Sequence, residues 1–110
     1  MREIKKIIVH CSATQEGRDF DAAEINRWHL KKGWSGIGYH YVVLLDGTIE
    51  YGRSIYKQGA HVKGENEGSI GICYIGGVEF YCGSNGEWIA KDTRTPEQKE
   101  SLLLLLKTLK

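Results

Sequence analysis

The sequence lacks the features that would place it in several large classes of protein. Its 110 residues contain one proline, and no apolar run approaches the roughly 20 residues that span a bilayer. We therefore expect no membrane association. Fifteen Lys and Arg residues against fourteen Asp and Glu residues give a net charge of +1. Proteins that bind nucleic acid by neutralising phosphates carry a basic excess, so we expect no nucleic-acid partner.

Sequence motifs for several common chemistries are missing as well. The chain has no CxxC pair, HExxH helix, phosphate-binding loop or dinucleotide fingerprint, and it has no internal repeat. Its three cysteines, Cys11, Cys73 and Cys82, are an odd number, so we expect no disulfide framework. The N-terminal apolar stretch at residues 7–9 is too short for a secretory signal peptide. This predicts synthesis in the cytoplasm.

The composition that remains is that of a single ordinary globular domain. Hydrophobic residues make up 41% of the chain and charged residues 26%, which is typical of such domains. Fourteen glycines predict many tight turns and close backbone approaches. We therefore interpret residues 1–110 as one domain.

Hydrophobic patterns predict the strands and their connections. Four segments have the apolar pattern of strands: residues 4–10, 38–45, 48–51 and 69–75. Asp46-Gly47, between the second and third of these, is a strong signal for a two-residue hairpin. Gly76-Gly77 and residues 84–86 indicate turns around a further short pair of edge strands. Residues 12–19 are expected to form a polar loop, and the long polar loop at 52–68 is typical of a binding element.

Two helices are predicted from capping signals. The first covers residues 21–32, where Asp21 and Glu24 have the spacing of a capping box. The second follows Thr95, with proline at its first position, and includes five consecutive leucines at residues 102–106. Because successive helical residues are about 100° apart, these leucines surround the helix. We expect one face to pack on the sheet and the other to be covered, either by a part of the domain that is missing from these residues or by a partner chain. The second case would be self-association through this helix.

The four histidines are the main candidates for chemistry. His10 ends the first predicted strand where a polar loop begins, so it is either a metal ligand or general base, or a hydrogen-bonded strand-end residue. His29 on the apolar face of the first helix and His40 inside the second strand are interpreted as structural. His61 lies in the long loop that we expect to contact a ligand.

Neighbouring tyrosines and cysteines limit how a site could be built around these histidines. Tyr39 and Tyr41 are expected to share one face of their strand, because side chains alternate. For the same reason His10 and Cys11 project to opposite faces, which argues against one metal ion binding both. Cys73 lies in an apolar run and is interpreted as a core residue.

Five segments of the chain, taken in order, resemble those of a known family. They read IIVHCSAT, INRWHLKKGWSGIGYHYVV, DGTIEYGR, GAHVKGENEGSIGICYIGG and TPEQKESLLLLL, at residues 7–14, 25–43, 46–53, 59–77 and 95–106. Together they resemble the zinc-dependent N-acetylmuramoyl-L-alanine amidases, a family that contains the lysozyme-type amidases (endolysins) of phages and the animal peptidoglycan recognition proteins. The resemblance spans nearly the whole chain.

The resemblance implies a fold, a reaction and a set of site residues. The fold would be α/β, with a central mixed β-sheet flanked by helices and a zinc ion in a groove at the strand ends. The reaction would be hydrolysis of the amide between N-acetylmuramic acid and L-alanine of the peptidoglycan stem peptide, with a muramyl peptide as partner. His10 is similar to the family's first zinc ligand, and Tyr39 resembles its catalytic tyrosine. Thr14, His61 and Asn66 fall where the family lines its substrate groove.

One part of the family pattern is missing from these residues. The family takes its second and third zinc ligands from a histidine and a cysteine or aspartate beyond the last helix, and the sequence stops at Lys110 inside that helix. We therefore expect a domain truncated at its C-terminus, without the family's C-terminal strand and helix region. One interpretation is a bacteriolytic, zinc-dependent hydrolase that reaches the cell wall after lysis or by separate export. The other is a non-catalytic peptidoglycan-binding or regulatory module.

Overall fold

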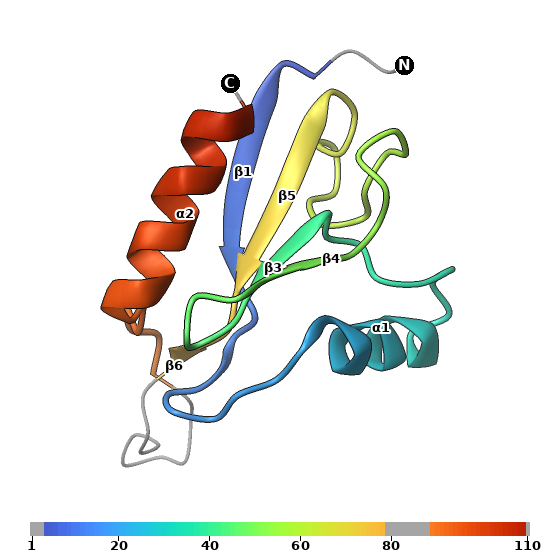
Figure 1. The fold of residues 1–110 in the computed structure, drawn as a ribbon. Helices are drawn as coiled ribbons and strands as arrows, with labels where there is room; N and C mark the ends of the chain where they lie inside the picture. Colours follow the sequence, from blue (N-terminus) through green and yellow to red (C-terminus); the bar gives the residue numbers. More distant parts are fainter. Residues whose placement is uncertain (1–3, 79–88, 110) are drawn as a thin grey trace.

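The computed structural model describes residues 4–78 and 89–109, and its centre is a four-stranded mixed sheet (Figure 1). The strands, in their order across the sheet, are β1 (Lys6–Cys11), β5 (Ser69–Tyr74), β3 (Tyr41–Val43) and β4 (Ile49–Tyr51). Strand β5 pairs in parallel with both β1 and β3, and β3 pairs antiparallel with β4. The mixed sheet confirms the predicted fold class, and the β3–β4 pair confirms the hairpin.

A second, much smaller sheet joins two segments that are far apart in the sequence. Strand β2 (Thr14–Gln15) pairs in parallel with β6 (Gly77–Val78), so the loop predicted at 12–19 is confirmed except at these two residues. A two-residue strand is too short to show any alternation of apolar and polar residues. Val78 also forms an isolated antiparallel bridge with Ala90. The turn expected at 84–86 and Cys82 lie outside the described residues.

Helices α1 (Ala22–Lys31) and α2 (Pro96–Leu109) begin at the predicted caps. At α1, the Asp21 carboxylate accepts from the Glu24 backbone N–H at 2.9 Å, and the Glu24 carboxylate accepts from that of Asp21 at 3.3 Å. At α2, the Thr95 hydroxyl oxygen accepts from the Gln98 backbone N–H at 3.0 Å, and the Gln98 side-chain oxygen accepts from the Thr95 backbone N–H at 2.9 Å. Each pair satisfies backbone donors that a helix start leaves without intrahelical partners.

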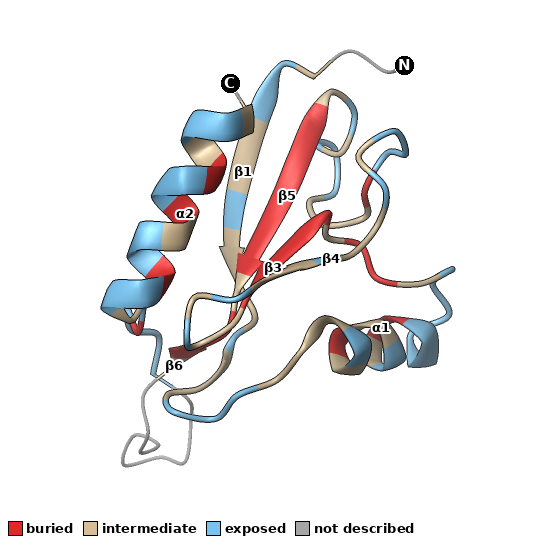
Figure 2. Ribbon diagram, viewed as in Figure 1, coloured by how far each residue is buried: buried red, intermediate tan, exposed pale blue. Residues whose placement is uncertain are grey.

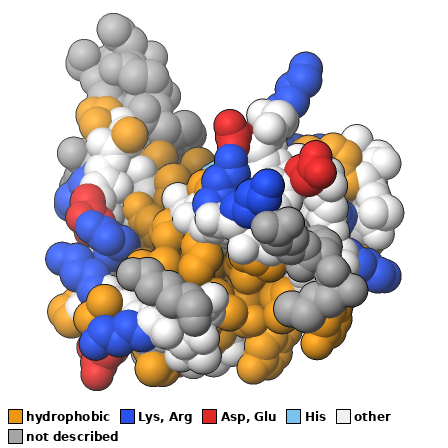
Figure 3. Space-filling view, turned by 90° about the horizontal axis from the view of Figure 1, so that it is seen from above, with side chains coloured by type: hydrophobic (Ala, Val, Ile, Leu, Met, Phe, Trp, Pro, Cys, Tyr) orange, Lys and Arg blue, Asp and Glu red, His pale blue; other side chains and the backbone are white. Residues whose placement is uncertain are grey.

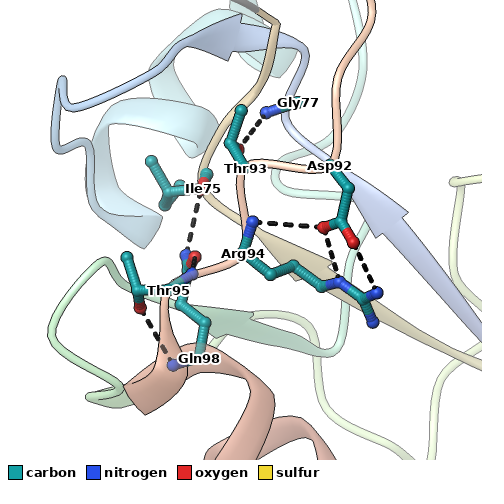
Figure 4. A network of polar contacts seen from close by, with 7 residues as sticks. All are labelled: Ile75, Gly77, Asp92, Thr93, Arg94, Thr95 and Gln98. Atoms are coloured by element: carbon teal, nitrogen blue, oxygen red, sulfur yellow. Dashed lines mark hydrogen bonds and ion pairs between the residues drawn. The ribbon is translucent and has the colours of Figure 1, made fainter.

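Gln98 also ties α2 to the sheet. Its side chain is fully buried, and its Nε2 donates to the carbonyl oxygens of Ile75 at 2.9 Å and Val43 at 3.3 Å (Figure 4). Beside it, the Thr93 hydroxyl oxygen accepts from the backbone N–H of Gly77 at 2.8 Å. A buried polar group left without a partner costs about 1–3 kcal/mol. These contacts therefore fix the start of α2 against the ends of β3 and β5.

The two faces of the sheet bury different clusters of side chains. Strands β3 and β5 are almost entirely buried, whereas β1 and β4 are mostly half-buried (Figure 2). The cluster on the α2 side consists of Tyr41, Val43, Ile70, Ile72, Leu102 and Leu105. The cluster on the α1 side consists of Ile25, Ile37, Val42, Cys73 and Ile75. Cys73 is fully buried, which confirms its interpretation as a core residue.

Tyr39 and Tyr41 lie on opposite sides of the sheet, so the prediction that they share a face was wrong. Tyr41 belongs to the cluster under α2, whereas Tyr39 packs against the cluster under α1. Strand β3 begins at Tyr41 rather than at residue 38, and His40 lies in a bend just before it. Strict alternation of side chains holds only within a strand, so it does not extend back to Tyr39.

The leucines of α2 face both the sheet and solvent. Leu102 and Leu105 are buried, while Leu103 and Leu104 are 53% and 58% exposed. This confirms that one helix face packs on the sheet. Coverage of the exposed leucines by another chain stays a prediction. Within the described residues, neither helix is long and apolar enough to cross a membrane.

An apolar groove lies between the start of β1 and the end of α2. Its volume is about 370 Å³. Its lining consists of Ile4, Lys5, Lys6, Ile7, Leu106 and Leu109. Figure 3 looks down onto the end of the molecule that carries both termini, where hydrophobic side chains are exposed between groups of Lys and Arg. Lys5 and Lys6 are the charged residues of this lining, and Lys6 forms an ion pair with Glu65.

Candidate functional site

The end of β1 brings one histidine to a second histidine from the long loop at residues 52–68. His10 Nε2 lies 2.9 Å from His61 Nδ1, and the ring centroids are 5.0 Å apart. In the β1–β5 register His10 pairs with Cys73, so its side chain faces the α1 side of the sheet. The predicted binding loop therefore meets the predicted metal ligand. Sequence reasoning found no spacing that would bring these two residues together.

His61 is held from several sides. The Asn66 side-chain oxygen accepts from the backbone N–H groups of His61 and Val62, each at 2.9 Å, and the Ser69 hydroxyl oxygen lies 3.2 Å from His61 Nε2. A Cβ atom on Gly71 would come within 2.6 Å of the His61 ring. Asn66, expected to line a groove, thus braces the loop that carries His61. Ser69 was not a candidate, because a serine at the start of a strand carries no distinctive signal.

Tyr39 lies beside His10, where the family resemblance expects a catalytic tyrosine. Its ring centroid is 5.6 Å from that of His10, and its hydroxyl hydrogen-bonds the Cys73 thiol. Burial, the largest effect, raises the pKa of Tyr39 above its ordinary value, and the neighbouring thiols of Cys73 and Cys11 raise it further. Burial also raises the pKa of Cys73 to about 12. Both groups therefore keep their protons at neutral pH.

His29 has the structural role predicted for it and also borders a cavity. It is 7% exposed, and its Nδ1 accepts from the backbone N–H of Gly38 at 2.9 Å. Burial lowers the pKa of His29, and the charges of Lys32 and Arg53 lower it further. The cavity has a volume of about 110 Å³ and is lined by Ser12, Ile25, Trp28, His29, Lys32 and Tyr39. Helix periodicity predicts only that His29 faces inward, so sequence reasoning missed this second role.

His40 is structural, as predicted. It is 1% exposed, its Nδ1 accepts from the backbone N–H of Gly71 at 3.0 Å, and its Nε2 lies 2.8 Å from the carbonyl oxygen of Lys57. These contacts connect β5 to the loop that carries His61. His40 therefore helps to hold this loop against the sheet, and it is not among the residues that line the cavity beside Tyr39.

Thr14 forms hydrogen bonds with Ser12 and Gly76. Its hydroxyl oxygen is 2.6 Å from that of Ser12 and accepts from the backbone N–H of Gly76 at 3.2 Å. These contacts fasten the chain after β1 to the segment after β5. Of the five residues implied by the resemblance, the structure thus groups His10, Tyr39 and His61.

The donor set of this site falls short of a catalytic zinc centre. Burial lowers the pKa of His10, which favours the neutral imidazole that binds metals. Within residues 4–78 and 89–109, however, no group of three or more His, Cys, Asp or Glu side chains could hold a metal ion. Because a catalytic zinc uses three protein ligands, these residues do not complete such a site by themselves.

Comparisons with known proteins agree with this fold and site. A family model described as N-acetylmuramoyl-L-alanine amidase matches residues 1–110. The endolysin of Escherichia phage T7 is 43% identical over 103 residues, which cover 94% of this chain and 64% of the endolysin. The solved amidase LysC from Clostridium intestinale URNW has a TM-score of 0.78 and 30% identity, over 98% of this chain and 63% of that one.

A peptidoglycan recognition protein has the same architecture. Protein LE, solved in complex with tracheal cytotoxin, has a TM-score of 0.73 and 27% identity, over 98% of this chain and 61% of that one. The chain thus spans less than two thirds of the length of these three relatives. The family model nevertheless covers every residue of the sequence, and the similarity in fold extends over nearly all of it. The chain belongs to the N-acetylmuramoyl-L-alanine amidase family.

Proposed function

We propose that this chain provides the substrate groove of a peptidoglycan hydrolase. The bond cleaved is the amide between N-acetylmuramic acid and L-alanine of the stem peptide. The observation that carries this proposal is the contact of the His10 imidazole with His61 on one side and Tyr39 on the other, in a chain of the amidase family. The cell wall is the place of action in this proposal, consistent with the similarity to phage endolysins.

Zinc dependence is the finer part of the proposal, with His10 as one ligand. A half-buried imidazole with a lowered pKa offers a lone pair at neutral pH, and histidine is the commonest metal ligand in proteins. The described residues do not supply three donors. The proposal therefore requires that further ligands come from residues other than these.

Tyr39 would act as a hydrogen-bond donor to the substrate. Because its raised pKa keeps the hydroxyl protonated, it can turn from the Cys73 sulfur and donate to an oxygen that gains negative charge, but it cannot serve as a base at neutral pH. A donor of this kind is worth about 3 kcal/mol in other enzymes. Tyr39→Phe should therefore lower kcat more than it raises KM. A change confined to KM would assign Tyr39 to substrate binding instead.

The cavity beside Tyr39 suits one end of a muramyl peptide. Trp28 and His29 supply aromatic surface, while Lys32 adds a positive charge at the rim. Aromatic faces pack against sugars and peptide backbones, and a lysine attracts the carboxylates that stem peptides carry. Peptidoglycan is accordingly the proposed partner.

Release of new L-alanine amino termini from purified peptidoglycan tests the hydrolase. The chain is incubated with zinc and cell-wall material, in parallel with His10→Ala and with Leu104→Gln as a matched control on the exposed side of α2. If residues outside 4–78 and 89–109 complete the zinc site, the parent chain and Leu104→Gln should hydrolyse the wall and His10→Ala should not. Equal activity of His10→Ala would remove His10 from the site.

The incomplete donor set favours a second candidate, a muramyl-peptide-binding module without hydrolase activity. The similarity to protein LE in complex with tracheal cytotoxin supports this alternative. It predicts that the chain is retained on insoluble peptidoglycan, releases no L-alanine amino termini and holds well under one zinc ion per chain. Hydrolysis by the parent chain would exclude this alternative.

A further inference from the structure

A line of hydrogen bonds leads from the backbone of the long loop to His10. The Ser69 hydroxyl donates to the carbonyl oxygen of Asn66 at 3.2 Å and also lies 3.2 Å from His61 Nε2. A hydroxyl group has only one hydrogen to donate. With that hydrogen on the Asn66 carbonyl, which can only accept, Ser69 accepts in its contact with His61. In this arrangement Nε2 of His61 carries a proton.

The same reasoning passes from His61 to His10. A neutral imidazole has one N–H group, so a proton on His61 Nε2 leaves a lone pair on its Nδ1. His10 Nε2 lies 2.9 Å from His61 Nδ1 and is then the donor. The single proton of neutral His10 is then on Nε2, and its own lone pair is on Nδ1.

We propose that His61 and Ser69 are positioning residues, which hold His10 as the Nε2–H tautomer and thereby place its lone pair on Nδ1. The tautomer of a functional histidine is set by the hydrogen bond that its other nitrogen makes. For its use in the reaction this inference rests on the proposed function. The tautomer itself is a property of the chain without substrate or metal.

The packing around His61 makes it a rigid acceptor. A Cβ atom on Gly59 would lie 2.6 Å from His61 Cδ2, and so would one on Gly71. The His61 ring is thus packed against the backbone at two glycines. The Asn66 side chain also accepts from the backbone N–H of His61. A ring confined in this way keeps Nδ1 directed at His10.

Two other histidines provide internal references for the experiment. His29 and His40 each accept a backbone N–H at Nδ1, from Gly38 and Gly71 respectively. A backbone amide can only donate, so both rings are Nε2–H tautomers when neutral. Their tautomers do not depend on Ser69 and should stay the same when it is replaced.

Long-range ¹H–¹⁵N correlation spectra of the ¹⁵N-labelled 110-residue chain, free of metal and above the histidine titration range, test the proposal. We expect Nε2 of His10 and His61 to have the shift of a protonated ring nitrogen and Nδ1 that of an unprotonated one. A proton on Nδ1 of either residue would overturn the proposal.

Variants separate positioning from simple packing. Ser69→Ala removes the acceptor that selects the His61 tautomer, so we expect His10 to change from one tautomer to a mixture, with His29 and His40 unchanged. Ser101→Ala removes a hydroxyl that donates to the carbonyl oxygen of Gly47. Ser101 belongs to α2, which packs on the other face of the sheet from His10, so this variant should leave the His10 spectrum as it is. An unchanged His10 spectrum in Ser69→Ala would overturn the proposal.

Substitution of His61 gives a second, independent outcome. His61→Asn keeps an oxygen acceptor near the position of Nδ1 and should preserve the His10 tautomer, whereas His61→Leu should lose it. The reverse pattern would contradict the proposal. If the tautomer is as proposed but wall hydrolysis is absent, the proposed function fails and this inference stands. If the tautomer is wrong, this inference fails whether or not the wall is hydrolysed.

Discussion

The two faces of β5 are built from different kinds of side chain. Towards α2 the strand presents Ile70 and Ile72, which belong to an apolar cluster with the leucines of that helix. Towards α1 it presents Ser69, Gly71 and Cys73, which are small and contact the site histidine or the tyrosine. One strand thus supports a packed core on one side and leaves room for imidazole rings on the other.

The site has room for its rings because the residues of β5 on that face have small side chains. Ile72 is fully buried, and its side chain fills the space between sheet and helix. On the opposite face, the ring of His61 occupies the space that a side chain at Gly71 would need. The α2 face should therefore be sensitive to removal of atoms, and the α1 face to their addition.

The largest expected effect is on the α2 face. Ile72→Ala should lower the free energy of unfolding by about 2–5 kcal/mol, because it leaves a cavity in the core. Urea unfolding measures the loss, and histidine ¹⁵N spectra of the folded variant should match those of the parent chain. A large change in those spectra would show that the two faces are not independent.

The matching change on the α1 face adds one methyl group. Gly71→Ala places a Cβ atom 2.6 Å from the His61 ring, so the ring must move, at a cost of about 1–3 kcal/mol in stability. We expect the spectra to show loss of the His10–His61 hydrogen bond. Retention of that hydrogen bond would mean that the loop at residues 52–68 shifts as a whole and keeps the His61 ring against His10.

The α1 face should also respond to pH. The pKa of His29 lies below the ordinary 6.5, so the folded chain binds this proton less readily than the unfolded chain does. Its contribution to stability is present above about pH 6.5 and is lost as the pH falls through the folded-state pKa. His29→Asn keeps an acceptor for the Gly38 N–H but does not titrate, so its stability should depend less on pH in this range. Urea unfolding at a series of pH values measures the difference, and identical pH profiles would contradict it.

The smallest effect is expected on the solvent side of α2. Leu104 is 58% exposed, so Leu104→Gln should change the free energy of unfolding by no more than about 0.5 kcal/mol. Thermal unfolding compares it with the parent chain. A loss of several kcal/mol that depends on protein concentration would instead show that this leucine is buried against a second chain.

The sequence predicted the elements whose signals are local. The capping box at Asp21 and Glu24, the cap at Thr95 and the hairpin at Asp46-Gly47 depend on residues a few positions apart, and the structure contains all three. The position of His10 near the end of the first strand is local information as well. Short-range hydrogen bonding and periodicity determine such features, which is why they can be read without a structure.

The composition of the site could be predicted only in part, because its geometry depends on the path of a long loop. His61 reaches His10 across 51 residues, and Asn66, Ser69 and Gly71 all contribute to holding it there. No repeating pattern records such a convergence. The face of the sheet on which Tyr39 lies could not be predicted either, because it depends on where β3 begins and not on the spacing of the tyrosines.

Gln98 has a consequence for how the molecule opens. Its amide joins the first turn of α2 to the carbonyl groups at the ends of β3 and β5, inside a region that solvent does not reach. Lifting the helix alone would remove the Gln98 amide from both carbonyl groups before water could replace it. Helix and sheet should therefore share a single opening event in amide exchange, with α2 unfolding as part of the same cooperative unit as the central strands.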